Sequence, residues 1–196
     1  DVAAGDYSGF IGGLAGVNYD ADLKDSHATG DIVGGHYTSY IGGLAGFNIV
    51  STENMFSNIN NCYATGNVTG GNDSHAIGGL VGRNGNNYQG SSITNSYATG
   101  RVTAGSGSYA LSGLCGYNNN GEIRNCYSTG GVQTGSYLGG LCGYHTGSTA
   151  IIENSFWDTE TSGLSVGYNL SSSSPGTVSN VYGKTTEQMK TKNTFE

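Results

Sequence analysis

The residues able to do acid–base chemistry are few and poorly grouped. Polysaccharide-cleaving enzymes need two carboxylates facing a groove. The close acidic pairs are Asp20 with Asp22 and Asp158 with Glu160. Neither pair has a His, Lys or Arg at a recurring position beside it. The sequence therefore predicts no catalytic residue and a protein that is not an enzyme. A polysaccharide-active enzyme built on these carboxylates is the alternative.

Metal binding is not expected either. Asp20, Asp22 and Asp25 offer the oxygen ligands that Ca²⁺ prefers, but the segment lacks the glycine and the terminal Glu of a known calcium loop. The histidines do not have the spacing of zinc ligands: His27, His36, His75 and His145. We expect a solvated acidic loop, no metal and no cofactor.

A two-block repeat organises the chain that carries these residues. The first block, Ile-Gly-Gly-Leu-Ala-Gly, begins at residue 11 and recurs in related form from residues 41, 77, 111 and 138. The second, of the type Asn-x-Tyr-Ala-Thr-Gly, begins at residues 25, 61, 95 and 125, with a degenerate copy at 154. The blocks hold their pattern while the intervening segments vary, as in stacked coils with variable loops.

The repeat predicts an all-β fold. Its blocks lack a helical period and are rich in strand-forming Tyr, Thr, Val and Ile. A unit this short must be covered by its neighbours, with each strand paired in parallel to its equivalent one coil away. We predict a right-handed parallel β-solenoid of about six coils over residues 1–163. The closing segment 164–196 has a capping-box pattern that predicts a short helix near 185–192.

Superposing the copies predicts which side chains point inward. Rows of Ala or Ser and of Val or Ile are expected to line one inner wall. An inner aliphatic row contains Leu14, Leu44, Leu80, Leu114 and Leu141. A row of asparagines whose amides can bond along the axis contains Asn18, Asn48, Asn84 and Asn118. His145 stands at the next position, where we expect it to break the row.

The motif Gly-Gly-Leu-x-Gly-x-Asn followed by Asn-x-Tyr-Ala-Thr-Gly-x-Val resembles the GLUG-motif repeat family over roughly residues 8–160. Residues 154–163 and 183–191 are similar to the segment that closes such arrays. Members are generally pieces of large bacterial and archaeal secreted proteins, including adhesin-like proteins and surface-bound peptidases. The resemblance implies an extracellular spacer or adhesive repeat and brings no catalytic residues.

The cysteines occupy repeated positions. Cys115 and Cys142 are equivalent in adjacent copies, about 4.8 Å apart in a solenoid, which a disulfide accepts. Cys62 and Cys126 are two coils apart, about 9.6 Å, which is too far. We name Cys115 and Cys142 as disulfide candidates. Four buried free thiols and a bridge from Cys126 to Cys115 or Cys142 are the alternatives.

An outer column is expected beside the inner rows. It contains His27, Tyr63, Tyr97, Tyr127 and Phe156, flanked by Thr residues. One interpretation is a ligand face for surface glycans or ice, with these candidates: Tyr63, Tyr97, Tyr127, Thr65, Thr99 and Thr129. The other, which we favour, is that the side chains stack to stabilise the sheet.

Composition limits the function. Only 11% of residues are charged and the net charge is −7, which argues against a nucleic-acid partner. The sequence contains no run of eighteen apolar residues, and no basic and apolar leader precedes Asp1. We therefore expect a mature or excised segment without membrane insertion. Abundant Asn, Ser, Thr, Gly and Tyr is typical of prokaryotic cell-surface proteins.

The expected function is an extracellular structural module. Because we find no cap before Ser8, we expect the first coil to dock on another copy, as a head-to-tail homopolymer, or on adjacent repeats of a longer chain. The product is a surface filament or an adhesin stalk. The alternative is a carbohydrate-binding adhesin that uses the Tyr and Thr columns.

Overall fold

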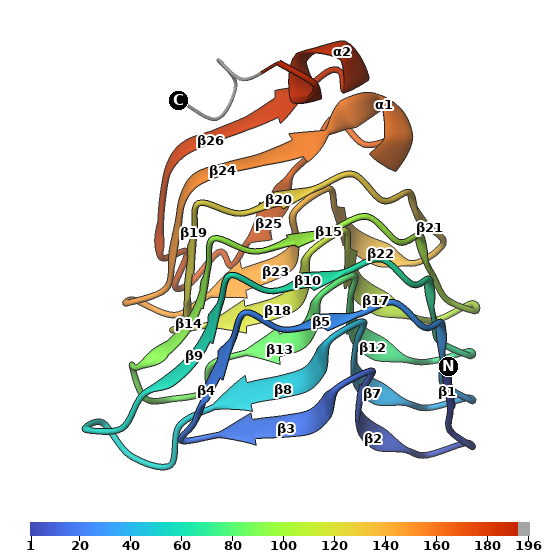
Figure 1. The fold of residues 1–196 in the computed structure, drawn as a ribbon, viewed down its shortest axis with the longest axis horizontal. Coiled ribbons are helices and arrows are strands. Elements are labelled where there is room, and N and C mark those ends of the chain that lie inside the picture. Colours follow the sequence, from blue (N-terminus) through green and yellow to red (C-terminus); the bar gives the residue numbers. More distant parts are fainter. Residues whose placement is uncertain (192–196) are drawn as a thin grey trace.

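The computed structural model describes residues 1–191 and is a parallel β-solenoid (Figure 1). The first coil comprises β1 (Val2–Ala3), β2 (Gly9–Gly12), β3 (Ala15–Tyr19), β4 (Asp22–Lys24) and β5 (His27–Ala28). The second comprises β6 (Ile32–Val33), β7 (Ser39–Gly42), β8 (Ala45–Ile49), β9 (Ser57–Asn60) and β10 (Tyr63–Ala64). The third comprises β11 (Val68–Thr69), β12 (His75–Gly78), β13 (Val81–Asn84), β14 (Ser91–Thr94) and β15 (Tyr97–Ala98).

The later coils continue this pattern. The fourth comprises β16 (Val102–Thr103), β17 (Tyr109–Ser112), β18 (Cys115–Asn119), β19 (Glu122–Arg124) and β20 (Tyr127–Ser128). The fifth comprises β21 (Val132–Gln133), β22 (Ser136–Gly139), β23 (Cys142–Thr146) and β24 (Ile151–Asp158). A partial sixth coil comprises β25 (Tyr168–Leu170) and β26 (Thr177–Lys184), so the prediction of about six coils is confirmed.

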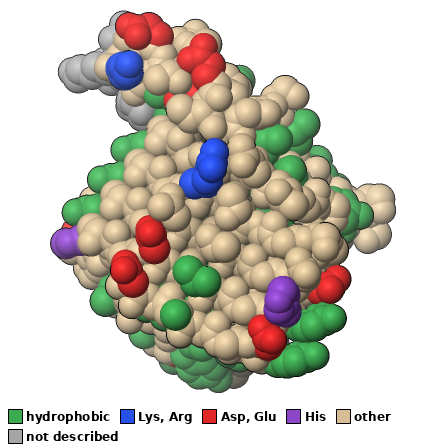
Figure 2. Space-filling model, turned by 90° about the vertical axis from the view of Figure 1, so that its right-hand side faces the viewer, with side chains coloured by type: hydrophobic (Ala, Val, Ile, Leu, Met, Phe, Trp, Pro, Cys, Tyr) green, Lys and Arg blue, Asp and Glu red, His purple; other side chains and the backbone are tan. Residues whose placement is uncertain are grey.

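Equivalent strands form four parallel sheets that run along the solenoid. We name them by their first strands: the β1 sheet (β1, β6, β11, β16, β21), the β2 sheet (β2, β7, β12, β17, β22), the β3 sheet (β3, β8, β13, β18, β23, β25) and the β4 sheet with the remaining strands. The register aligns the repeat copies position by position, as in Ile41 with Ile77 and Val68 with Val102. Charged side chains are sparse on the face in Figure 2.

The interior is a narrow stack of small and aliphatic side chains. Leu44, Leu80, Leu114 and Leu141 are fully buried, as predicted. Leu14 belongs to the same row but is 50% exposed, because no coil covers the N-terminal side of the first one. The expected inner wall is also confirmed, with these side chains buried: Ala28, Ala64, Ala98, Ser128, Ile32, Val68, Val102 and Val132.

The asparagine that opens the second block has a conformational reason. Asn61, Asn95, Asn125 and Asn154 have φ values of 54°, 51°, 53° and 48°, in the left-handed region. Asn tolerates that region better than most residues because its short polar side chain can bond locally. The turn into each β5-type strand therefore favours Asn at this position.

The closing segment adds strands that the sequence did not predict. β25 pairs with β23, and β26 pairs with β24 along Ile151–Asp158. Two single-turn helices, α1 (Thr159–Ser162) and α2 (Thr186–Met189), lie at the same end (Figure 1). The predicted capping box at Thr185 and Gln188 is present, although α2 is shorter than the predicted range and residue 192 lies outside the described residues.

No helix within residues 1–191 combines the length and the apolar character needed to cross a membrane.

Candidate functional surfaces

The predicted outer aromatic column is a continuous ladder of stacked rings. Ring centroids are 4.8 Å apart for His27 and Tyr63, 5.1 Å for Tyr63 and Tyr97, and 4.8 Å for Tyr97 and Tyr127. The planes of each pair lie within 6° of parallel. Both faces of Tyr63 and of Tyr97 are thus covered by neighbouring rings.

This stacking bears on the glycan interpretation of the ladder. A sugar packs on the face of an aromatic ring, and the rings inside the ladder offer only their edges and hydroxyl groups. Thr65 and Thr99 are exposed and Thr129 is half-buried, so the Thr candidates form one narrow row. The geometry favours the interpretation in which Tyr63, Tyr97 and Tyr127 stabilise the sheet.

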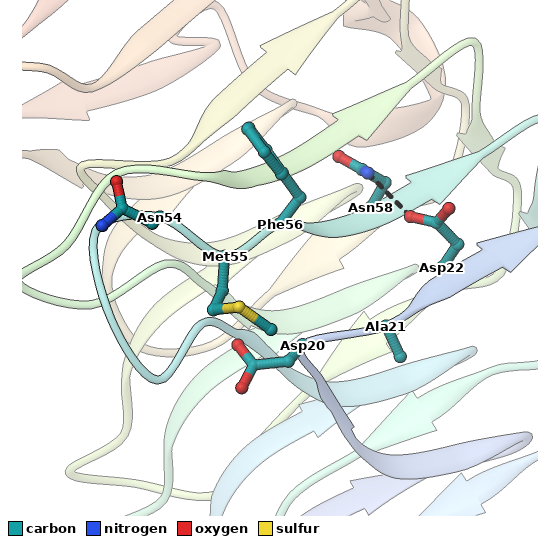
Figure 3. Close-up of a pocket in the computed structure, with 7 residues that line it drawn as sticks. All are labelled: Asp20, Ala21, Asp22, Asn54, Met55, Phe56 and Asn58. Atoms are coloured by element: carbon teal, nitrogen blue, oxygen red, sulfur yellow. Dashed lines mark hydrogen bonds between the residues drawn. The ribbon is translucent and has the colours of Figure 1, made fainter.

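The first acidic pair is divided between different partners. Asp22 accepts a hydrogen bond of 2.7 Å from Asn58 (Figure 3). It also pairs with Lys24 at 2.9 Å. The hydrogen bond from Lys24, followed by that from Asn58, lowers the pKa of Asp22. Asp20 instead accepts from the backbone N–H of Ser51 at 2.8 Å. The pocket in Figure 3 is therefore lined by two carboxylates with different roles. Asp22 is paired with Lys24, and Asp20 accepts a hydrogen bond from the backbone of the loop at Ser51.

The second acidic pair fastens the two helices together. Asp158 is buried and caps α1 by accepting from the backbone N–H groups of Glu160 and Thr161. Its other oxygen accepts from the hydroxyl of Thr186 at 2.8 Å, and Glu160 accepts from the Thr186 N–H at 2.9 Å. These contacts give the pair a structural use at the C-terminal end.

Within the described part of the chain, no three His, Cys, Asp or Glu side chains come close enough together to hold a metal ion.

The cysteines all face the core. Cys115 and Cys142 are aligned in register on β18 and β23, as the sequence predicted, and both are fully buried. All four cysteines are free thiols in this structure. Burial, and then the hydrogen bond and charge of Cys142, raises the pKa of Cys115; burial raises that of Cys126 to about 12.

We expect the native protein to resist alkylation. Only the thiolate reacts quickly, and a buried thiol with a raised pKa forms almost none at neutral pH. Iodoacetamide followed by mass spectrometry of the native protein should find Cys62, Cys115, Cys126 and Cys142 unmodified. Alkylation after unfolding without reductant then tests the predicted disulfide: a linked Cys115–Cys142 peptide supports it, and four modified thiols contradict it.

The predicted asparagine row is a buried hydrogen-bonded ladder. The Asn18 amide donates to Asn48 at 2.8 Å, Asn48 to Asn84 at 2.8 Å, and Asn84 to Asn118 at 2.9 Å. All the bonds run the same way, with the amide of each coil donating to the oxygen of the next. The ladder thus has a polarity that the sequence did not reveal.

His145 continues the row instead of breaking it, which corrects the expectation from the sequence. Its Nδ1 lies 3.0 Å from the Asn118 amide nitrogen. Since that amide is a donor, His145 must be neutral and accept through Nδ1. Burial lowers the pKa of His145 to about 4, with the Thr177 backbone opposing the shift.

We expect His145 to make the fold acid-sensitive. The pKa of His145 in the folded protein, about 4, lies below the ordinary value of 6.5. Between these two values the unfolded state therefore binds more protons than the folded state. Stability is therefore complete above pH 6.5 and declines toward pH 4, with a loss of about 2 kcal/mol by pH 5.

The matched variant is His145→Asn, which restores the residue found in the preceding coils. Urea unfolding at pH 7 and pH 5 should show a smaller loss for this variant than for the parent protein. An equal loss in both proteins would assign the acid sensitivity to other groups.

The two ends of the solenoid differ. The N-terminal face, which we define by Phe10, Leu14, Val17 and Tyr19, exposes 46%, 50%, 41% and 57% of those side chains. Within residues 1–191, the strands of the first coil also have no partner strand on this side. The opposite end carries β26, α1 and α2 (Figure 1). There the buried asparagine row stops at His145, because its partner Leu170 follows a register irregularity and is 46% exposed.

The sequence reasoning missed a second aromatic surface. On the outer face of the β3 sheet, Phe47, Arg83, Tyr117 and Tyr144 stand in register. They occupy the variable position of Gly-x-Asn in the first block, so superposing that position reveals the column.

The comparisons with known proteins agree with this architecture. The model of the GLUG motif matches residues 9–33, 37–69, 73–103 and 107–133. Neither the search of curated proteins nor that of solved structures gave a match. The matched segments make up more than half of the chain, and each runs from a strand of the β2 sheet to the strand of the β1 sheet in the following coil. The chain therefore belongs to the GLUG-motif family.

Proposed function

We propose that this chain is an extracellular structural module, a stiff β-solenoid rod that continues through its N-terminal face into further coils of the same kind. The observation that carries the proposal is the continuous register of four parallel sheets, which ends at an uncovered apolar coil. A rod of this kind resists bending because main-chain bonds connect every coil to the next.

A repeat coil complements the N-terminal face in two ways. Leu14 is half-exposed, whereas the equivalent leucines, covered on both sides, are fully buried. The ladder polarity also matches, because Asn48, Asn84 and Asn118 each accept an amide N–H from the coil before them. A preceding Asn would make the same bond to Asn18.

The end of a second copy complements this face less well. At that end the buried row stops at His145, because Leu170, which pairs with it after a register irregularity, is 46% exposed and has no side-chain donor. The helices α1 and α2 also occupy part of that end (Figure 1). Of the two expected partners, we therefore favour adjacent repeats over a head-to-tail homopolymer, with an adhesin stalk or surface filament as the product.

A role without catalysis fits the uses of the carboxylates. The oxygens of Asp158 and Glu160 hold the N-termini of α1 and α2, and Asp22 is bound to Lys24 and Asn58. The paucity of charge and the absence of Lys-rich segments support a location at a prokaryotic cell surface.

Electron microscopy of the native material tests the proposal. We expect rods much longer than one chain, whose six coils span about 29 Å, with a cross-β spacing of about 4.8 Å along the axis. Discrete particles of one-chain length would contradict it. The purified chain can be tested by sedimentation. Assembly of the parent chain that is abolished by Leu14→Glu would instead favour the homopolymer.

A further inference from the structure

An aromatic surface that the proposed rod does not require lies where the β2 and β3 sheets meet. We define the aromatic platform by Tyr40, Arg83, Tyr109, Tyr117, Tyr137 and Tyr144, which come from coils two to five. Tyr109 and Tyr137 are 41% and 53% exposed, and the other members are half-buried. The platform contains no acidic side chain.

Arg83 is the cation of this platform. Its guanidinium carbon lies 5.0 Å from the centre of the Phe47 ring, 5.2 Å from that of Tyr117 and 5.5 Å from that of Tyr40. It donates to the Gly85 carbonyl at 3.2 Å and to the Tyr40 hydroxyl at 3.3 Å. Among the described residues it forms no ion pair, in contrast to Lys24 and Arg124.

The bonding of Arg83 leaves room for an outside acceptor. The two hydrogen bonds use Nε and Nη1. Guanidinium has five N–H donors in a planar fork, and the aromatic contacts hold that plane in place. A carboxylate is the acceptor whose shape and charge match such a fork.

The ring orientations differ from those of the ladder. Tyr137 meets Tyr144 at 72°, Tyr40 meets His75 at 80°, and Tyr117 is tilted by 36° from Tyr144. Tyr109 stacks on His75 at 5°, which covers one face of the Tyr109 ring and leaves the other for a sugar. Rings that meet edge to face leave at least one of their faces uncovered by the partner. The platform therefore combines open aromatic faces, tyrosine hydroxyls and one cation.

We propose that the aromatic platform binds an acidic polysaccharide, with sugar rings packed on Tyr109 and Tyr137 and a uronate carboxylate bound to Arg83. Sugar rings have apolar faces and hydroxyl edges, which match the ring faces and hydroxyl groups of tyrosine. An acidic protein segment also supplies carboxylates, and poly-glutamate serves as the probe for it. The attraction for an anionic sugar comes from Arg83 itself and not from the overall charge, because the whole chain carries a net charge of −7.

Calorimetry with oligogalacturonate tests the proposal, with the fully methyl-esterified oligomer as control. At physiological salt we expect the acid to bind at least about tenfold more tightly than the ester, because only the acid supplies a carboxylate. Arg83→Gln should weaken binding of the acid by about tenfold or more, and Arg83→Lys by less.

The exposed tyrosines provide a second set of variants that is independent of Arg83. Tyr137→Asn and Tyr109→Ser should also weaken binding. Tyr7→Asn is the matched control, because Tyr7 is exposed and shares the left-handed backbone of Tyr137, with φ of 60° and 52°. Its affinity should equal that of the parent protein. Thermal unfolding of each variant checks that the fold is kept.

Four results would overturn the proposal. They are absence of binding to the acid, equal affinity for acid and ester, affinity unchanged by Arg83→Gln in a folded protein, and equally tight binding of poly-glutamate. The last result would assign the platform to acidic protein segments. None of them bears on the rod, whose test is the length of the particles.

Discussion

Gly79→Ala is expected to destabilise the solenoid by more than about 3 kcal/mol. Gly79 stands at the corner between β12 and β13 in the third coil. A Cβ there would collide with the carbonyl oxygen of Gly113 in the next coil and come within 3.0 Å of the Ala98 Cβ.

The cost arises because neither neighbour can retreat. Gly79 donates its N–H to the Ser112 carbonyl, so the third and fourth coils are bonded at the corner where the methyl group must fit. Separating them would break the parallel register that holds the rod together. The backbone of Gly79 is not in the left-handed region, so the penalty is steric and not conformational.

Gly5→Ala is the matched control. Nothing lies within 4 Å of a Cβ built on Gly5, and its backbone is likewise outside the left-handed region. Urea and thermal unfolding should leave this variant within about 0.5 kcal/mol of the parent protein. Hydrogen exchange in Gly79→Ala should increase most in the third and fourth coils, because each coil contacts mainly its neighbours. Similar stability of the two variants would refute this account of the corner.

Much of the fold could be predicted because the repeat aligns residues that the structure then pairs. The copies of Leu44 and Val68 lie in register because identical blocks place them on identical strands. By contrast, the segments that form β25 and β26 do not contain the two repeat blocks. These strands pair through backbone hydrogen bonds, which depend little on side-chain identity. Their positions depend on the fifth coil being present to act as a template.

The functional surfaces were less predictable for a different reason. A column such as Phe47, Arg83 and Tyr117 can be read by superposition, but the angle between its rings depends on neighbouring strands. Tyr40 and Tyr137 reach the same surface from β7 and β22 with left-handed backbones, φ of 56° and 52°. A left-handed residue within a strand redirects the side chain relative to simple alternation, and the sequence carries no clear mark of it.

Asn84→Ala is expected to cost about 3–4 kcal/mol, because it interrupts the ladder at its centre and leaves buried acceptors without donors. Asn84 is fully buried and donates to Asn118 Oδ1 at 2.9 Å and to the Glu122 carbonyl at 3.1 Å. Each buried acceptor that loses its partner costs about 1–3 kcal/mol. Asn48 is less affected, since its amide also donates to the carbonyls of Ser57 and Ser92.

The expected loss therefore falls on the C-terminal side of Asn84, as the polarity of the ladder requires. Hydrogen exchange should increase more around Asn118, in the fourth coil, than around Asn48, in the second. Asn87→Ala, in the exposed loop after β13, is the control and should leave unfolding unchanged within about 0.5 kcal/mol. An equal increase in hydrogen exchange around Asn48 and Asn118 would argue that the amides are oriented differently. The hydrogen-bond argument for a coil preceding Asn18 would then fail, whereas the argument from the exposure of Leu14 would stand.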